Sequence, residues 1–277
     1  MVYTVRDIHT LGVKMSSKIN WLVAHTSPGA LVLQQWLTEN GVSYSLAQKY
    51  AQNGWLKKLC SGVYYRPDAR GDIKPTWVDA IQALDVQLGV SVHLAGLSSL
   101  THQGLSHYLQ LNKEQVWICV KNKSSLPKWF REFPYQNWFY CGSHKLEVNP
   151  EKDLKRITVK EKELTVSCAE LAAYEVVDAI GKLISFEHVA ELFQGLVNLS
   201  PRKVQDILER SSSVQANRIF LFLGRYYDHQ WVNRVDETRI KLGAGKRQVV
   251  EKGRFDERYQ ITVPEILSVK KGEQHNG

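Results

Sequence analysis

The chain has 277 residues, which is long for one compact core, so we expect two domains. Hydrophobic residues make up 43% of it, but the longest apolar run, Ile219–Leu223, is far too short to cross a bilayer, so we expect no membrane-spanning segment. The formal net charge of +8 indicates an anionic partner.

Charged side chains interrupt the first fifteen residues, so no apolar core of a signal peptide is present and we expect a cytoplasmic protein. Apolar spacing then predicts a helix over Lys18–Ala24 and a second over Ala30–Leu37, which ends at Asn40-Gly41. Ser43 is expected to cap a third helix, with Asn53-Gly54 as its stop signal.

Two β-prone runs follow, Trp55–Cys60 and Val63–Pro67, with Ser61-Gly62 between them, which is the signature of a hairpin. Three helices and a hairpin in this order predict a winged helix-turn-helix, whose wing is the hairpin. We assign it to residues 1–75 and expect a hinge at Arg66–Pro75.

The remainder, residues 76–277, is predicted to be a larger mixed α/β region with a subdivision near 150–165, so the fold class is α+β. Glu147–Glu163 is expected to be a solvated connection, and Ser167 with Glu170 a capping box. The expected strands are Ser91–Leu94, Tyr108–Leu111, Gln115–Val120, Trp138–Cys141, Leu164–Val166, Arg239–Leu242, Gln248–Glu251 and Arg258–Val263. The expected helices are Trp77–Leu88, Gly96–Gln103, Lys128–Glu132, Leu171–Leu183, Phe186–Val197, one capped by Ser200 with Pro201 at its first position, and Gln215–Tyr227.

The third helix and the wing are the predicted DNA-binding surface. In a winged helix-turn-helix the helix after the turn lies in the major groove, and basic wing residues contact phosphates. The stretch Ser43–Arg66 contains no acidic residue, which favours DNA as its partner. The alternative is a winged domain that is used only for contact with other proteins. The predicted DNA-binding residues are Ser43, Tyr44, Ser45, Gln48, Lys49, Gln52 and Asn53 of the helix, with Lys57, Lys58 and Arg66 of the wing.

Other motifs give weaker signals. The four cysteines form no CxxC pair, so we expect reduced, mostly buried thiols, with no disulfide, no metal site and no cofactor. Neither His102 with His107 nor Cys141 with His144 has a metal-binding context. Gly243–Lys246 lacks the spacing of a phosphate loop and is expected to be a basic turn.

Asp153 and Lys155 match the DxK kernel of metal-dependent nucleases, but such a triplet arises easily in a charged segment. No other catalytic constellation is present, so we expect a protein that is not an enzyme. A DNA-targeted nuclease centred on this pair, and a ligand-sensing transcription factor, remain the alternatives.

Several segments together resemble the AbiEi antitoxin family. They are Pro28-Gly29-Ala30 through Trp36-Leu37, Gly41-Val42-Ser43, Leu46–Tyr50, Gly54-Trp55-Leu56, Gly62-Val63-Tyr64, Ser91–Leu97, Gln103–Leu109 and Leu126–Phe130. The resemblance is strong over residues 18–135, and beyond them it rests on length and general order.

The resemblance implies an antitoxin of an abortive-infection, phage-defence toxin–antitoxin pair. The winged domain would repress its own operon by binding inverted repeats in the promoter, and the C-terminal part would neutralise a nucleotidyltransferase toxin without forming a stable complex. Paired half-sites would require two copies on the DNA.

Overall fold

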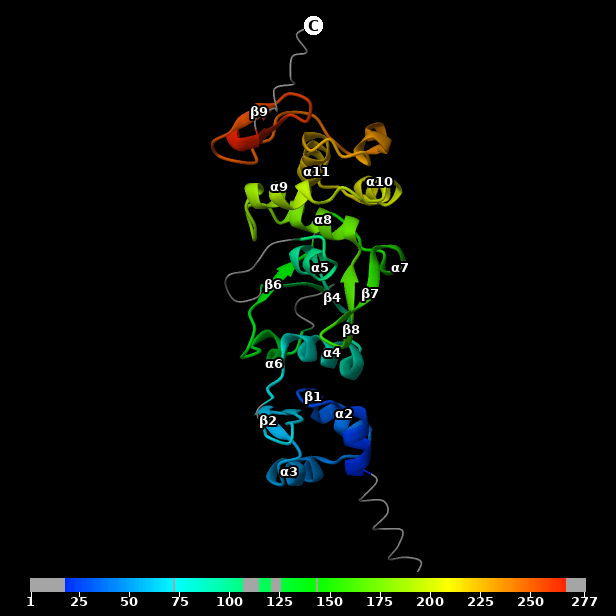
Figure 1. The fold of residues 1–277 in the computed structure, drawn as a ribbon, viewed down its shortest axis with the longest axis vertical. Coiled ribbons are helices and arrows are strands. Elements are labelled where there is room, and N and C mark those ends of the chain that lie inside the picture. The colour runs from blue at the N-terminus through cyan, green and yellow to red at the C-terminus, as the bar shows by residue number, and fades with distance from the viewer. Residues whose placement is uncertain (1–17, 72, 107–114, 121–125, 143, 268–277) are drawn as a thin grey trace, which may run out of the picture. The chain divides into compact units, whose positions relative to one another are not determined.

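The computed structural model describes residues 18–71, 73–106, 115–120, 126–142 and 144–267 (Figure 1). It contains helices and several separate sheets, so the fold is α+β, as predicted. Residue contacts divide it into two units. The first is drawn from Met1–Val92, Lys121–Gln136 and Lys160–Lys162, and the second from His93–Val120, Asn137–Val159 and Glu163–Gly277.

The first unit contains the helix-turn-helix and its wing. Residues 18–25 are helical, as predicted. They are followed by β1 (Leu31–Leu33), α2 (Gln34–Glu39), α3 (Tyr44–Gln52), β2 (Lys57–Cys60) and β3 (Val63–Tyr65). The strands form a sheet of order β1-β3-β2, in which both pairings are antiparallel. The predicted hairpin is therefore confirmed, with its turn at Ser61-Gly62.

The helix predicted over Ala30–Leu37 was wrong in its first half. Leu31, Val32 and Leu33 are all buried and pair with β3, so they form β1, and the helix begins only at Gln34. A long-range strand partner outweighs the local helical spacing here, because pairing satisfies the backbone of three consecutive buried residues.

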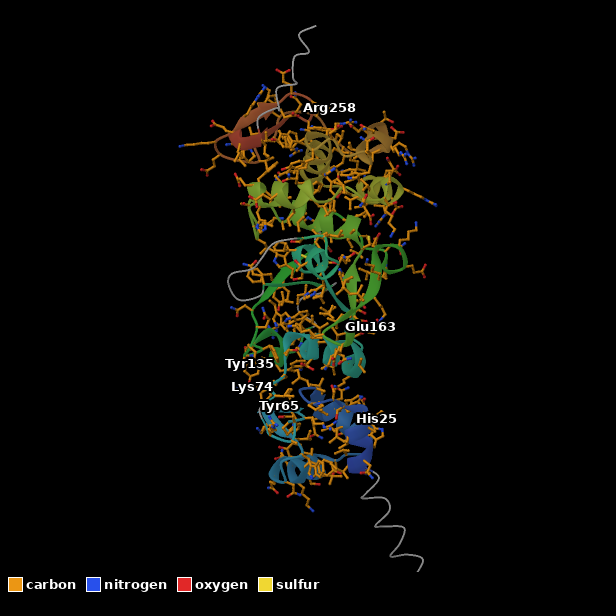
Figure 2. The ribbon with its side chains drawn as sticks, viewed as in Figure 1. His25, Tyr65, Lys74, Tyr135, Glu163 and Arg258 are labelled. Atoms are coloured by element: carbon orange, nitrogen blue, oxygen red, sulfur yellow. The ribbon has the colours of Figure 1, made fainter. Side chains whose placement is uncertain are left out.

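Helix α4 (Trp77–Leu88) also belongs to the first unit and packs against the edge of β1. The Gln87 amide donates to Leu31 O over 2.7 Å, and its carbonyl accepts from Leu33 N over 2.8 Å. Gln87 therefore covers a strand edge that would otherwise be open to another strand. In the same unit, Lys74 Nζ lies 5.8 Å from the centroid of the Tyr135 ring (Figure 2).

A five-stranded sheet of order β6-β5-β4-β8-β7 lies further along the chain. Its strands are β4 (Val92–Leu94), β5 (Val116–Val120), β6 (Trp138–Cys141), β7 (Leu154–Val159) and β8 (Lys162–Ser167). The short helices α5 (Gly96–His102) and α7 (Pro150–Asp153) belong to the second unit, and α6 (Lys128–Arg131) belongs to the first. Strands β4 and β8 pair in parallel, as do β5 and β6. The strand predicted over Tyr108–Leu111 lies outside the described residues.

The expectation that Glu147–Glu163 is only a solvated connection was wrong. This segment contains α7 and the edge strand β7, in which the consecutive residues Lys155 and Arg156 are both exposed and Val159 is buried. Lys160 and Glu161, both with positive φ, form the turn into β8. The high charge of the segment reflects an edge strand whose charged side chains are exposed.

Four helices form the predicted cluster: α8 (Ala169–Asp178), α9 (Phe186–Gln194), α10 (Pro201–Arg210) and α11 (Val214–Tyr226). Ser200 caps α10 by accepting from Lys203 N, as predicted. The predicted capping box was wrong: α8 is preceded by Cys168, and Ser167 Oγ donates instead to Glu175. Glu170 accepts from Ser200 N, which joins α8 to the start of α10.

The last part of the second unit has fewer strands than expected. It contains the short 3₁₀ helices η2 (Val232–Arg234), η3 (Glu237–Arg239) and η4 (Glu265–Leu267), and the antiparallel strands β9 (Arg254–Asp256) and β10 (Ile261–Val263). The strands predicted over Arg239–Leu242 and Gln248–Glu251 are not formed. Among the described residues, the helices are too short or too polar to span a membrane.

Candidate nucleic-acid interface

Helix α3 has one buried face and one exposed face. The Ser43 hydroxyl accepts from Leu46 N and so caps the helix, as its sequence predicts. Ala47 and Tyr50 are buried in a small core that also contains Leu22, Leu37 and Leu56. Packing of one face on this core directs the other side chains of α3 outward.

Most of the predicted DNA-binding side chains are exposed. Tyr44 is 61% exposed at the first position of α3. No acidic residue occurs between Ser43 and Arg66, so positive charge on this surface is not neutralised from within the segment. The exposed members of the predicted set are Ser43, Tyr44, Ser45, Lys49, Gln52, Asn53, Lys57 and Lys58.

Gln48 is only partly exposed, because its amide is used inside the domain. Its Nε2 donates to the hydroxyl of Tyr64 on β3 over 2.8 Å. Burial raises the pKa of Tyr64, so its phenol remains protonated at neutral pH. Gln48 therefore connects the helix to the wing sheet, and its carbonyl oxygen and second N–H are the groups left to accept from and donate to a ligand.

The two lysines of β2 differ in their surroundings. Lys57 Nζ donates to the carbonyl of Gly71 over 2.7 Å, whereas Lys58 is exposed next to an irregularity in the β2–β3 pairing between Lys58 and Cys60. Such a bulge increases strand twist and re-aims side chains. Lys58 is thus the wing lysine whose ammonium group is more fully presented to solvent.

The Arg66 side chain forms hydrogen bonds within the first unit. Its Nη1 donates to Val23 O over 3.0 Å and also to Thr26 O. These carbonyls lie in and just after the helix of residues 18–25, whose last carbonyls lack partners within the helix. The guanidinium therefore closes the C-terminal end of that helix instead of extending the exposed wing.

Trp55 is an exposed aromatic residue that the sequence analysis did not single out. It follows Gly54, whose φ is +78°, and is 49% exposed between α3 and β2. The sequence had assigned it to a strand, where an aromatic residue is expected to pack. The signal that could have found it is its position directly after the glycine that ends α3.

Asp153 is a structural residue in this fold. It is 2% exposed, its two carboxylate oxygens lie 2.9 and 3.1 Å from Arg210 Nη2, and one accepts from Asn149 N over 2.7 Å. Lys155 is exposed on β7. The carboxylate expected to hold a metal in a nuclease is therefore already bound to an arginine.

The Gly243–Lys246 turn uses its carbonyl groups, whereas a phosphate loop uses its N–H groups. Arg218 donates to Leu242 O over 2.6 Å, to Gly243 O over 3.0 Å and to Gly245 O over 2.7 Å. These hydrogen bonds from Arg218 fix the backbone of the segment as a turn, in agreement with the predicted basic turn. His102 is partly exposed, His144 is exposed, and His107 lies outside the described residues.

Two known protein families match consecutive parts of the chain. A family described as "Transcriptional regulator, AbiEi antitoxin N-terminal domain" matches residues 15–111, and one described as "Transcriptional regulator, AbiEi antitoxin, Type IV TA system" matches residues 113–264. A search of curated proteins gave no match.

A solved structure has a similar fold. The crystal structure of the RV2827C protein from Mycobacterium tuberculosis matches with a TM-score of 0.58 and 13% identity, over 84% of this chain and 85% of that chain. At that identity the likeness concerns the fold alone. The two family matches together extend well beyond half of the sequence, so the chain belongs to the AbiEi antitoxin family, the transcriptional regulators of type IV toxin–antitoxin systems.

Proposed function

We propose that this antitoxin represses its own operon by binding inverted repeats in the promoter, with α3 in the major groove and the β2–β3 wing on the flanking phosphates. The observation that carries the proposal is that polar and basic side chains of α3 and β2 are exposed, in a stretch of sequence without acidic residues, while Ala47 and Tyr50 are buried and anchor the helix. Gln and Asn amides can bind adenine edges, and lysines can bind guanine or phosphates.

The proposed contacts differ in kind. Tyr44, Ser45, Gln52 and Asn53 supply base and sugar contacts, and Lys49 and Lys58 supply charge. Ser43, Gln48 and Lys57 contribute with the groups that remain after their internal hydrogen bonds. Arg66 is left out of this interface, because its guanidinium binds two carbonyl groups of the protein.

Two chains acting on paired half-sites would follow the symmetry of an inverted repeat. We also propose that residues 76–277 neutralise a cognate nucleotidyltransferase toxin in the cytoplasm, and that the protein acts as a regulator and not as an enzyme. The boundary near residue 75 and the subdivision near 150–165 belong to this proposal.

Fluorescence anisotropy with the promoter duplex tests the DNA-binding part. The double variant Lys49→Ala/Lys58→Ala should bind both promoter and random duplexes more weakly, and the slope of log K against log salt should become shallower by about 1 to 2. Lys252→Ala, an exposed lysine of the second unit, is the matched charge control. An unchanged slope in the double variant would contradict the proposed interface.

Growth assays separate repression from neutralisation. Full-length chain carrying Lys49→Ala/Lys58→Ala should still rescue cells that express the adjacent toxin gene, while a promoter–reporter fusion becomes derepressed. Loss of both activities in a folded variant would mean that the two functions do not reside in separate regions.

A further inference from the structure

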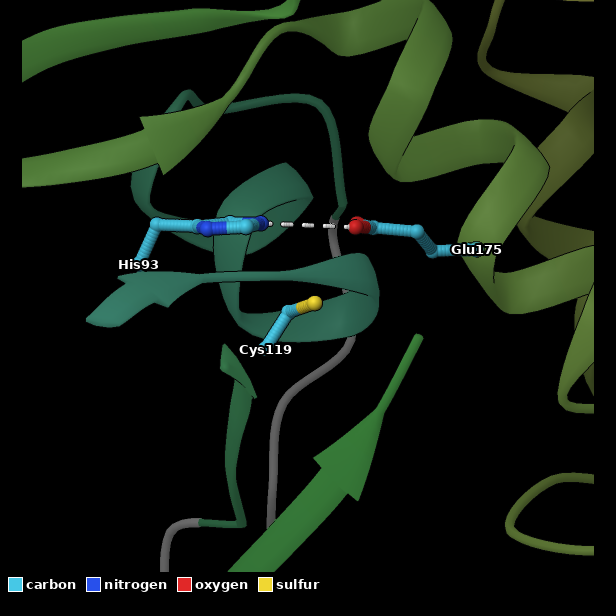
Figure 3. A group of neighbouring side chains, drawn as sticks. All are labelled: His93, Cys119 and Glu175. Atoms are coloured by element: carbon cyan, nitrogen blue, oxygen red, sulfur yellow. Dashed lines mark ion pairs between the residues drawn. The ribbon is translucent and has the colours of Figure 1, made fainter. Parts of the chain in front are cut away.

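Three side chains of the second unit that are typical metal ligands converge in the interior. They are His93 on β4, Cys119 on β5 and Glu175 on α8, and they are 8%, 8% and 5% exposed. Their potential ligand atoms all lie within 4.8 Å of one another. Figure 3 shows the imidazole and the carboxylate pointing toward each other, with the thiol beside the space between them.

The distance between imidazole and carboxylate fits a shared ion better than a direct hydrogen bond. His93 Nε2 and Glu175 Oε1 are 3.6 Å apart, and neither atom has a hydrogen-bond partner. A charge-assisted hydrogen bond would bring them to about 2.7–2.9 Å. Two ligands of one tetrahedral zinc ion, each bound at about 2.0–2.2 Å, lie about 3.4 Å apart.

The other oxygen of the carboxylate is held by the protein. Glu175 Oε2 accepts from Gly96 N over 2.7 Å and from Ser167 Oγ over 2.8 Å. These two bonds fix the carboxylate with Oε1 directed at the imidazole. Carboxylates that bind metals commonly have such outer hydrogen bonds, which orient the ligand and are needed for full affinity.

The position of the Cys119 thiol requires a glycine at residue 142. The φ of Gly142 is +122°, and a Cβ atom built on this glycine would lie 2.8 Å from Cys119 Sγ, which is closer than real Cβ contacts. Any side chain at residue 142 would therefore displace the sulfur. Glycine at residue 142 thus leaves the space that Cys119 Sγ occupies in the cluster.

We propose that His93, Cys119 and Glu175 bind one zinc ion, with a water molecule in the fourth position. Sulfur, nitrogen and oxygen ligands on one tetrahedral centre are characteristic of zinc. The ion joins two strands of the sheet to α8, and so ties the sheet to the helical cluster. This proposal revises the expectation of no metal site, which rested on the absence of paired cysteines.

The protonated cluster is the competing state. Burial opposes the charged imidazole, but the contacts with Cys119 and Glu175 outweigh it and raise the pKa of His93 to about 9. A zinc ion displaces that proton and the thiol proton, because metal ligands must be deprotonated. The cluster therefore binds either protons or a metal, and a direct metal measurement distinguishes the two.

The test uses the purified full-length chain. After equilibration with ZnCl₂ and desalting, elemental analysis should find about one zinc per chain. Metal-free protein titrated with CoCl₂ should develop a thiolate-to-cobalt charge-transfer absorption and the intense visible bands of tetrahedral cobalt. Zinc should then displace the cobalt. Absence of retained zinc together with absence of the charge-transfer band would overturn the proposal.

Variants assign the ligands. Cys119→Ser should abolish the charge-transfer band, whereas Cys168→Ser, which removes another buried thiol of the same unit, should keep it. Ser167→Ala should lower zinc affinity by about 10- to 100-fold while leaving all three ligands in place. Circular dichroism checks that each variant is folded. If Cys119→Ser does not fold, Gly142→Ala provides the test, since displacing the sulfur should weaken the band. A band that persists in the folded Cys119 or Gly142 variant would refute the assignment.

Discussion

The Gln48 side chain donates a hydrogen bond to the Tyr64 hydroxyl over 2.8 Å, which links the middle of α3 to the central strand of the wing sheet. A residue expected to contact bases is therefore also part of the support of the helix. This bond holds α3 against the wing together with the buried Ala47 and Tyr50, so structural and recognition roles of Gln48 must be separated by experiment.

Two variants separate these roles. Tyr64→Phe and Gln48→Ala each remove the same hydrogen bond, and each should lower the free energy of unfolding by about 0.5–1.5 kcal/mol in urea titrations. Only Gln48→Ala removes a side chain from the proposed groove surface, so only it should relax the preference for promoter over random duplex. Equal relaxation by Tyr64→Phe would mean that Gln48 acts by positioning α3.

Arg66 is expected to matter for stability and little for DNA affinity. Replacing it with alanine leaves Val23 O and Thr26 O without their charged donor, so Arg66→Ala should lower the free energy of unfolding by about 1.5–3 kcal/mol. The salt dependence of DNA binding should stay as in the parent protein. Arg70→Ala, at an exposed arginine in the same unit, should change stability by less than about 0.5 kcal/mol. A shallower salt slope in folded Arg66→Ala would place its guanidinium on a phosphate instead.

Local signals and long-range partners explain what the sequence could and could not predict. Ser43 as a cap and Gly62 in the hairpin turn act within a few residues, so their roles could be read directly. The identity of β1 depends on β3, which lies much later in the chain, and helical spacing gave the wrong answer there.

The same reasoning applies to the sites. An exposed face of α3 follows from its apolar spacing, but the sequence does not reveal that Arg66 binds the carbonyls of a helix far upstream. His93, Cys119 and Glu175 come from three separate elements with no recurring spacing, so only the fold brings them together. A search for sequence motifs therefore does not detect such a cluster.

Glu237 should contribute to stability in a pH-dependent way. Its Oε1 accepts from Arg225 Nε over 2.9 Å and from the Tyr259 hydroxyl over 3.0 Å. Burial alone would raise its pKa, but the bonds from Arg225 and Tyr259 outweigh burial and lower the pKa below the ordinary 4.5. The stabilisation is therefore fully present above about pH 4.5 and is lost as the pH falls through the lower, folded-state value.

Glu237→Gln tests this expectation. The variant should unfold at a lower urea concentration at pH 7, and its stability should decline less steeply than that of the parent protein below pH 4.5. Glu251→Gln, at an exposed glutamate of the same unit, is the matched control and should follow the parent curve. Parallel curves for the parent and Glu237→Gln would mean that the Arg225 contact does not depend on charge.

Asp153 provides the sharpest distinction between a structural and a catalytic role for the charged segment. The carboxylate is 3% exposed and the Arg210 side chain 28% exposed, and the contact raises the pKa of Arg210 although burial opposes its charge. Asp153→Ala removes the charge-assisted hydrogen bonds between this carboxylate and Arg210, while Arg210 keeps its bond from Nε to Asp206 over 3.0 Å, so the substitution should lower the free energy of unfolding by about 1.5–3 kcal/mol. Lys155→Ala should change it by less than about 0.5 kcal/mol, since that side chain is exposed. In a plasmid assay with Mg²⁺ or Mn²⁺, parent and Lys155→Ala protein should leave the DNA intact. Nicking by the parent that disappears in folded Lys155→Ala would restore the nuclease hypothesis, because an exposed lysine has no structural reason to be required.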